Sequence, residues 1–126
     1  MKIHRRIISC IIILIMSVIT LSMFSVGVAS AAQDSSTITL TLSDSYGDGW
    51  NGNKLQITYG STTEELTLST GKTGTFEREI PQGSQLTVKF IGTSFISENS
   101  FTITYEDGTE ILSVAQGDCV NNKNYG

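Results

Sequence analysis

The feature that most constrains the fold of this chain is an apolar residue at every second position. This pattern recurs in short segments from residue 36 onwards. In Ser36 to Ser43, the apolar residues Ile38, Leu40 and Leu42 alternate with threonine. The same kind of alternation recurs at residues 54–59, 64–69, 75–80, 85–91 and 100–105, and the apolar residues at 111–115 add a last short strand. Because successive side chains of a strand point to opposite faces, each segment is expected to be a half-buried β-strand.

Turn signals separate these segments, and no helical period interrupts them. Pro81-Gln82-Gly83-Ser84 and Asp107-Gly108 are strong turn sequences, and residues 60–63 and 70–74 are glycine-containing breaks. About seven or eight short strands at such spacing are typical of an antiparallel sandwich. We therefore predict an all-β chain with a single antiparallel β-sandwich of the jelly-roll or CUB-like kind.

The N-terminus has the pattern of a secretory signal peptide. Lys2, Arg5 and Arg6 precede an uncharged, apolar run from Ile7 to Val28, and Ala29-Ser30-Ala31 supplies small residues for cleavage. Cleavage is expected after Ala31. The alternative is a retained membrane anchor, since the run is long enough to span a bilayer. The predicted organisation is a signal peptide at 1–31, a flexible leader at 32–36, the sandwich domain at 37–115 and a polar tail at 116–126, which is expected to fray.

Removal of residues 1–31 makes the chain strongly acidic. Three of the eight basic residues leave, whereas all twelve acidic residues stay, so the remaining chain carries a net charge of −7. Such a surface disfavours nucleic acid and anionic lipid and suits cations, although it equally serves solubility. Cys119 is then the sole cysteine, so an internal disulfide is excluded, and it is expected to be a free thiol or to pair between chains.

The sequence from Asp44 to Asn53, DSYGDGWNGN, concentrates the chemistry of the chain. It holds two Asp, two Asn, three Gly and the single Trp. Carboxylate and amide oxygens on a glycine-rich backbone can surround a hard cation such as Ca²⁺. The structural alternative is a tight connection between strands, in which Asx side chains cap turns and Trp50 packs on the core edge.

Comparison with an EF-hand loop shows what the segment lacks. Asp44, Asp48 and Gly49 fit positions 1, 5 and 6, but Tyr46 occupies position 3 and Leu55 stands where a bidentate Glu is required. Another segment must therefore supply a carboxylate, and Glu98 is the best candidate because loops at one end of a sandwich cluster. The expected Ca²⁺ ligands are the carboxylates of Asp44, Asp48 and Glu98 and neutral oxygens of Trp50, Asn51 and Asn53. Zn²⁺ is less suited, because His4 leaves with the signal peptide and Cys119 is distant in sequence.

The segment Asp-Ser-Tyr-Gly-Asp-Gly-Trp-Asn-Gly resembles the motif of a family of secreted β-sandwich modules. Further matches occur in order at Leu55-Gln56-Ile57, Pro81-Gln82-Gly83, Glu98 to Ile103 and Asp107-Gly108. The resemblance covers roughly residues 37–115 and implies a CUB-like or jelly-roll fold with a Ca²⁺ site. Members often carry Cys where this chain has Ser84, which leaves the partner of Cys119 missing.

These observations predict a secreted, non-enzymatic Ca²⁺-binding module, extracellular or at the cell surface. Its ion-ordered loops would support extracellular assembly by self-association into oligomers or fibres. The alternative is an adhesion or carbohydrate-recognition module that binds a glycan or cell-surface ligand through the Trp50 loop face. A small secreted hydrolase is a weaker alternative, because no catalytic constellation survives removal of His4. No nucleic acid is expected as a partner, and no membrane after cleavage.

Overall fold

The computed structural model describes residue 27 and residues 32–126 of the 126-residue chain, and seven strands form within that part. A single short 3₁₀ turn, η1 (Ile96–Glu98), interrupts the pattern there. The strands are β1 (Ser35–Asp44), β2 (Lys54–Tyr59), β3 (Thr62–Leu66), β4 (Thr73–Pro81), β5 (Leu86–Ile91), β6 (Asn99–Tyr105) and β7 (Glu110–Val114). The predicted all-β class is confirmed.

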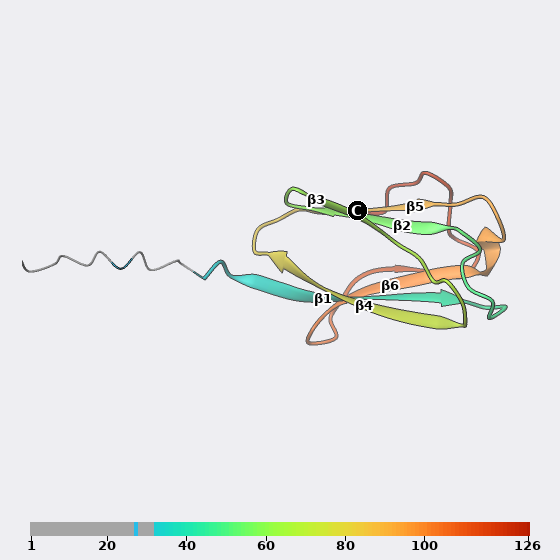
Figure 1. Cartoon of the computed structure of the whole chain (residues 1–126), viewed down its shortest axis with the longest axis horizontal. Helices are drawn as coiled ribbons and strands as arrows, with labels where there is room; N and C mark the ends of the chain where they lie inside the picture. Colours follow the sequence, from blue (N-terminus) through green and yellow to red (C-terminus); the bar gives the residue numbers. More distant parts are fainter. Residues whose placement is uncertain (1–26, 28–31) are drawn as a thin grey trace, which may run out of the picture. The chain divides into compact units, whose positions relative to one another are not determined.

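The strands form two antiparallel sheets that lie in two layers (Figure 1). One sheet has the order β4-β1-β6-β7 and the other has the order β3-β2-β5. Consecutive strands often lie in different sheets, as β1 and β2 do, so their connections pass from one sheet to the other at the ends of the sandwich. This arrangement is that of a β-sandwich.

The alternation in β1 determines what the first sheet buries. Ile38, Leu40 and Leu42 are at most 2% exposed, while the residues between them are partly exposed. The register of β1 with β6 places Leu40 opposite Ile103 and Leu42 opposite Phe101, which are buried on the same face. The period of two therefore sets the core, as the sequence pattern predicts.

Strand boundaries agree with the sequence pattern within a few residues. The second predicted strand, residues 54–59, coincides with β2. The break expected at residues 60–63 is shorter, because β3 already begins at Thr62 and pairs with Tyr59. The Asp107-Gly108 turn joins β6 to β7 in an antiparallel pair, as predicted.

The C-terminal tail is ordered, and the prediction that it frays is wrong. Its backbone pairs with β5, because the amide of Asn122 donates to the carbonyl of Phe90 and the amide of Tyr125 donates to that of Val88, both at 2.8 Å. The Tyr125 ring also meets the Phe101 ring edge-on at 5.6 Å. The backbone bonds cover the free edge of β5, and Cys119 and Tyr125 pack on the core, so both kinds of contact hold this polar sequence.

An ion pair links the two sheets along one side of the sandwich. Arg78 on β4 donates to Glu64 on β3 through Nε at 2.6 Å and through Nη2 at 2.8 Å. Both side chains are largely shielded from solvent, with exposures of 29% and 25%. The Arg78 hydrogen bonds lower the pKa of Glu64 despite opposing desolvation. This pair joins edge strands that share no backbone bonds.

The predicted signal peptide, residues 1–31, lies outside the described residues apart from Gly27. Among the residues that are described, no helix has the length and apolarity needed to cross a membrane.

We predict that Glu64→Gln lowers the free energy of unfolding by about 1 kcal/mol at about pH 7, because the bidentate pair becomes a weaker neutral contact. Since the folded pKa of Glu64 is lowered, the stabilisation is present above the unfolded pKa and disappears as the pH falls through the folded value. Urea unfolding of both proteins across this range measures the effect. Glu65→Gln, which breaks the more exposed pair with Lys54, is the matched control and should cost less. A deficit that stays constant down to about pH 2 would contradict the assignment.

Candidate metal site

Asp44 ends β1 at the next inward position after Ile38, Leu40 and Leu42. The same alternation that builds the core therefore carries a carboxylate into it, and Asp44 is only 2% exposed. One of its oxygens, Oδ2, accepts the backbone amides of Gly47 and Asp48. The other, Oδ1, is buried and has no hydrogen-bond partner. A dehydrated carboxylate oxygen without a partner is costly, so it indicates that a ligand or water belongs there.

Asp48 and Glu98 bring two further carboxylates to Asp44. One oxygen from each of the three residues lies within 4.8 Å of the others. Oxygens bound to a common Ca²⁺ at about 2.5 Å can be up to about 5 Å apart, so this spacing suits that ion. Glu98 reaches the group because β6 pairs with β1, which sets Asn99 opposite Asp44, and because the Ser45 amide donates to the Glu98 carbonyl at 2.9 Å.

The electrostatics of this acidic triad, Asp44, Asp48 and Glu98, favour a cation. Partial desolvation, and then the charges of Asp44 and Asp48, raise the pKa of Glu98. Lys72 lies close by, since a Cβ on Gly47 would meet its Cγ at 3.0 Å, yet Lys72 forms no ion pair among residues 32–126. The three carboxylates are therefore not neutralised by a basic side chain in the described part of the protein.

Trp50 closes the apolar core below the triad. It is fully buried, and its ring meets Phe90 of β5 at 5.6 Å and Phe101 of β6 at 6.5 Å, both edge-on. Its indole Nε1 donates to the Ser43 carbonyl at 2.9 Å. Trp50 thus ties the loop to both sheets, and it offers no ring face for a ligand. Trp50 packs into the core, as in the structural alternative given above, so a ligand could not stack on its ring, and recognition through the rest of this loop face remains a prediction.

Asn53 fastens the glycine-rich loop to the connection before β6. Its side-chain nitrogen donates to the Ser94 carbonyl at 2.6 Å and to Asn99 Oδ1 at 2.7 Å. Its oxygen accepts the amides of Thr93 and Ser94, and the residue is 2% exposed. Gly92 makes this approach possible, because a Cβ there would lie 2.3 Å from the Asn53 oxygen.

The loop is also fixed against the connection between β3 and β4. The Trp50 amide donates to the Leu68 carbonyl at 2.7 Å, and Asp48 forms a backbone bridge with Gly71. Gly49 has φ of +95°, and a Cβ there would meet the Leu68 carbonyl oxygen at 2.6 Å. Only glycine fits this position. The loop after β1, the connection between β3 and β4 and the connection before β6 therefore meet at one end of the sandwich.

The neutral oxygens expected as ligands have different surroundings. The Trp50 carbonyl accepts the Asn53 amide at 2.8 Å, and the Asn53 carboxamide oxygen already accepts two amides. The exposed Asn51 side chain donates to Asp48 at 3.3 Å, which places it beside the triad. Ligand roles for these three residues remain predictions. The bonds give Asn53 a positioning role in holding the Glu98 connection.

Three residues near the triad were not recognised from the sequence. Asn99 is fully buried opposite Asp44, and its side-chain nitrogen also lacks a partner. Phe95 is 65% exposed with φ of +51°. Lys72 comes from a distant turn. Only the position of Asn99 in the alternating pattern of β6 could have suggested its inward direction.

Cys119 is buried near this end and does not act as an exposed thiol. It is 3% exposed, and its Sγ donates to the Asn99 carbonyl at 3.4 Å. Desolvation, followed by the charge of Asp118, raises the pKa of the thiol to about 11. Pairing between folded chains would therefore require the tail to open, so the free-thiol alternative fits the structure.

Comparisons with protein-family models, with curated proteins and with solved structures found no match for this chain. The resemblance of the DSYGDGWNG segment to secreted β-sandwich modules therefore remains a prediction from sequence.

We predict that Asn53→Ala lowers the free energy of unfolding by about 3 kcal/mol, because it removes a buried hydrogen-bond centre and leaves the amides and carbonyl it served unpaired. Asn51→Gly is the matched control, since it removes an exposed bond from the same loop, tolerates the φ of +51° at this position, and should change stability by less than about 0.5 kcal/mol. Urea unfolding measures both. Similar losses for the two variants would show that Asn53 does not hold the connection.

Proposed function

We propose that this protein is a secreted, non-enzymatic module that binds Ca²⁺ at the acidic triad and uses the ordered loops for assembly outside the cell. The observation that carries the proposal is the buried, unpartnered Oδ1 of Asp44 within a group of three carboxylates. An acidic cluster alone is common on protein surfaces. A dehydrated carboxylate oxygen in that cluster is uncommon, and a bound cation would supply the missing partner.

The donor set matches a hard cation. All three side chains offer carboxylate oxygens, which suit Ca²⁺ better than softer metals. The only cysteine sulfur in residues 32–126 belongs to Cys119, and that atom is engaged with the Asn99 carbonyl. The ion would neutralise the repulsion among Asp44, Asp48 and Glu98 and would tie the loop after β1 to the connection before β6.

We also propose an extracellular location, a role in assembly and a CUB-like or jelly-roll type of sandwich. The two antiparallel sheets support the general architecture. The signal-like N-terminal sequence and the acidic composition support secretion. The proposal includes no catalytic step.

Recognition of a glycan or cell-surface ligand is the second candidate function. The observation that favours it is Tyr46, which is 75% exposed within the same loop. Its ring, rather than that of buried Trp50, would be the surface on which a sugar could stack.

We predict that calorimetry with CaCl₂ detects binding by the wild-type protein, and that Asp48→Asn and Glu98→Gln each weaken it by about tenfold or more, because each removes a charged ligand. Glu77→Gln is the matched control. It neutralises an exposed carboxylate on β4, away from the triad, and should leave the affinity unchanged.

The unfolding temperature of Glu98→Gln, compared with that of the wild-type protein, should depend on whether the ion is present. In EDTA, Glu98→Gln should raise the unfolding temperature, because it removes repulsion with Asp44 and Asp48. With Ca²⁺ it should gain less stability than the wild-type protein, since ligand binding stabilises in proportion to affinity. Absence of Ca²⁺ binding to the wild-type protein would overturn the proposed function.

A further inference from the structure

We infer that Asn99 is a positioning residue of the proposed Ca²⁺ site and that it holds a water molecule bound to the buried side of the ion. The inference rests on the proposed Ca²⁺ function and adds an uncharged side chain to the three carboxylates. It also defines where the ion lies, because the water separates the ion from Asn99.

Two buried side-chain polar atoms in residues 32–126 have no hydrogen-bond partner, and they belong to neighbouring residues. They are Oδ1 of Asp44 and Nδ2 of Asn99, whose residues are 2% and 0% exposed. The two residues lie opposite each other on β1 and β6. The Ser45 amide donates to the Glu98 carbonyl just beyond them, so they form a non-hydrogen-bonded pair, in which opposing side chains lie closest.

The hydrogen-bond network decides which atom of the Asn99 amide is the unpaired one. The backbone amides of Thr93 and Ser94 can only donate, so the Asn53 atom that meets them is its oxygen. The nitrogen of Asn53 therefore faces Asn99 at 2.7 Å, and the atom that it meets there must be the Asn99 oxygen. The unpaired atom is Nδ2, which can donate hydrogen bonds but cannot accept them.

Neither side chain is free to turn toward the other. Oδ2 of Asp44 accepts the amides of Gly47 and Asp48, and Oδ1 of Asn99 accepts the side-chain nitrogen of Asn53. A rotation that brought Oδ1 of Asp44 onto Nδ2 of Asn99 would give up these bonds. The unpaired donor and the unpaired acceptor therefore require a third group between them.

A bare cation satisfies only one of these two atoms. Ca²⁺ can bind Oδ1 of Asp44, but the N–H groups of Asn99 present the positive end of the amide dipole and repel it. The oxygen of an ion-bound water accepts from Nδ2, while the ion and Oδ1 hold the other side of the water. Ca²⁺ takes about six to eight oxygen ligands, water among them. A buried water with about two to four polar partners is a stable part of a structure.

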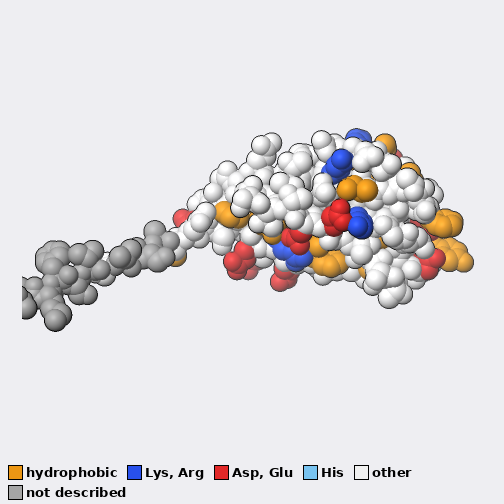
Figure 2. All heavy atoms as spheres, turned by 45° about the horizontal axis from the view of Figure 1, so that its top comes forward, with side chains coloured by type: hydrophobic (Ala, Val, Ile, Leu, Met, Phe, Trp, Pro, Cys, Tyr) orange, Lys and Arg blue, Asp and Glu red, His pale blue; other side chains and the backbone are white. Residues whose placement is uncertain are grey.

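The opposite side of the triad is open to solvent, so the ion enters from there. Asp48 is exposed and Glu98 is partly exposed, whereas Asp44 and Asn99 are buried. Figure 2 shows acidic side chains at the surface, beside hydrophobic ones, at the end of the molecule where β1 ends in Figure 1. The ion is therefore expected between Asp44 and the more exposed carboxylates, with the water on its buried side.

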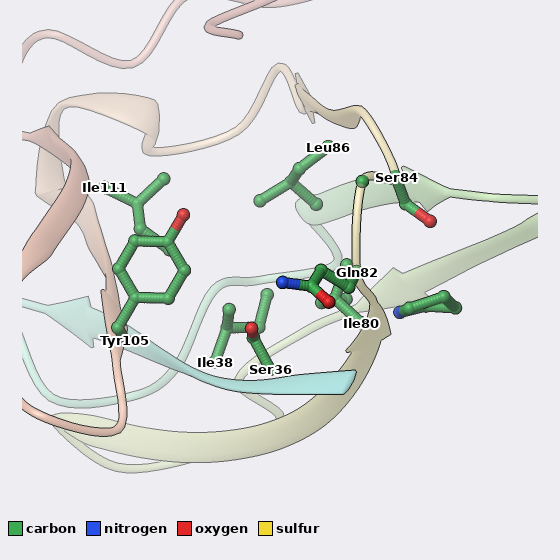
Figure 3. Close-up of a pocket in the computed structure, with 10 residues that line it drawn as sticks. Ser36, Ile38, Ile80, Gln82, Ser84, Leu86, Tyr105 and Ile111 are labelled. Atoms are coloured by element: carbon green, nitrogen blue, oxygen red, sulfur yellow. The ribbon is translucent and has the colours of Figure 1, made fainter. Parts of the chain in front are cut away.

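The hollow at the end of the sandwich where β1 begins offers no such pair of atoms. Figure 3 shows the apolar side chains of Ile38, Leu86 and Ile111 around it, together with polar groups of Ser36 and Gln82. No buried side-chain nitrogen or oxygen among its lining residues lacks a partner. In the part of the chain that the structure describes, unsatisfied buried side chains are thus confined to the triad end.

The first test looks for the water in the wild-type protein with CaCl₂. Nuclear magnetic resonance should show a nuclear Overhauser effect between a long-lived water and the Nδ2 protons of Asn99, and a crystal grown in CaCl₂ should show this water bound to the ion. The amide of Asn124, exposed on the tail, is the internal control and should meet only fast-exchanging water. A direct bond from Nδ2 to Asp44, or an Nδ2 without a water, would overturn the inference.

Two variants test whether Asn99 holds the water. Asn99→Leu removes the donor at similar size and should weaken Ca²⁺ binding about tenfold or more in calorimetry, as loss of other groups that orient metal ligands does. Asn99→Asp keeps the acceptor for Asn53 and puts an anionic oxygen in place of Nδ2, so that this oxygen should bind the ion instead of the water.

The number of waters on the ion separates this role from a purely structural one. Eu³⁺, which is close to Ca²⁺ in size, reports that number through its luminescence lifetimes in H₂O and D₂O, and it should lose about one water in Asn99→Asp. Asn124→Asp adds the same charge at an exposed position of the tail and should leave the number unchanged. An unchanged number in Asn99→Asp would overturn the inference, and this measurement stands even if Asn99→Leu does not fold.

The outcomes also separate this inference from the proposed function. Wild-type protein that binds Ca²⁺ without a water at Asn99 would overturn the inference and leave the ion site standing. A water that bridges Asp44 and Asn99 in EDTA but leaves when Ca²⁺ binds would do the same. No Ca²⁺ binding in calorimetry would show that the proposed function itself fails, and the inference would fail with it.

Discussion

The burial of a carboxylate at the end of β1 is the constraint on which this end of the molecule depends. A strand that buries Ile38, Leu40 and Leu42 must also turn Asp44 inward, because side chains alternate strictly between the two faces. The chain accommodates that charge by bending the following loop back, so that the amides of Gly47 and Asp48 reach one carboxylate oxygen. The second oxygen remains without a partner, and the other acidic side chains gather around it.

In the loop of residues 44–53, different residues close the core and carry the charge. Trp50 fills the space between the sheets with apolar surface, whereas Asn53 bonds three backbone groups of the connection before β6 and the Asn99 side chain at the start of β6. Because buried contacts hold both Trp50 and Asn53, they fix the loop that lies beside the acidic triad. A binding site gains affinity when its frame does not have to be ordered on binding. The Asn53 bonds to Thr93 and Ser94 also hold the neighbouring Phe95 in its positive-φ conformation.

The strands can be predicted because their signal is local, and the closeness of Glu98 to Asp44 and Asp48 can be predicted because the EF-hand comparison leaves a carboxylate missing. The roles of Asn53 and Trp50 depend on which connections meet at one end of the sandwich, and no periodicity encodes that. The order of the C-terminal tail was missed for a related reason. The backbone bonds to β5 leave no alternation in its side chains, so its polar composition wrongly predicts a frayed end.

Away from the triad, basic side chains of the chain neutralise the carboxylates of Glu64 and Glu65. Glu64 receives a bidentate guanidinium from Arg78, which joins the sheets without any ion from solution. At the triad, Lys72 lies against the loop but forms no ion pair within residues 32–126. The three carboxylates left together keep this end charged unless a cation from solution binds there. If the proposed Ca²⁺ site has the affinity of extracellular Ca²⁺ modules, about 0.1–1 mM, it would fill where Ca²⁺ is abundant and stay empty where Ca²⁺ is scarce.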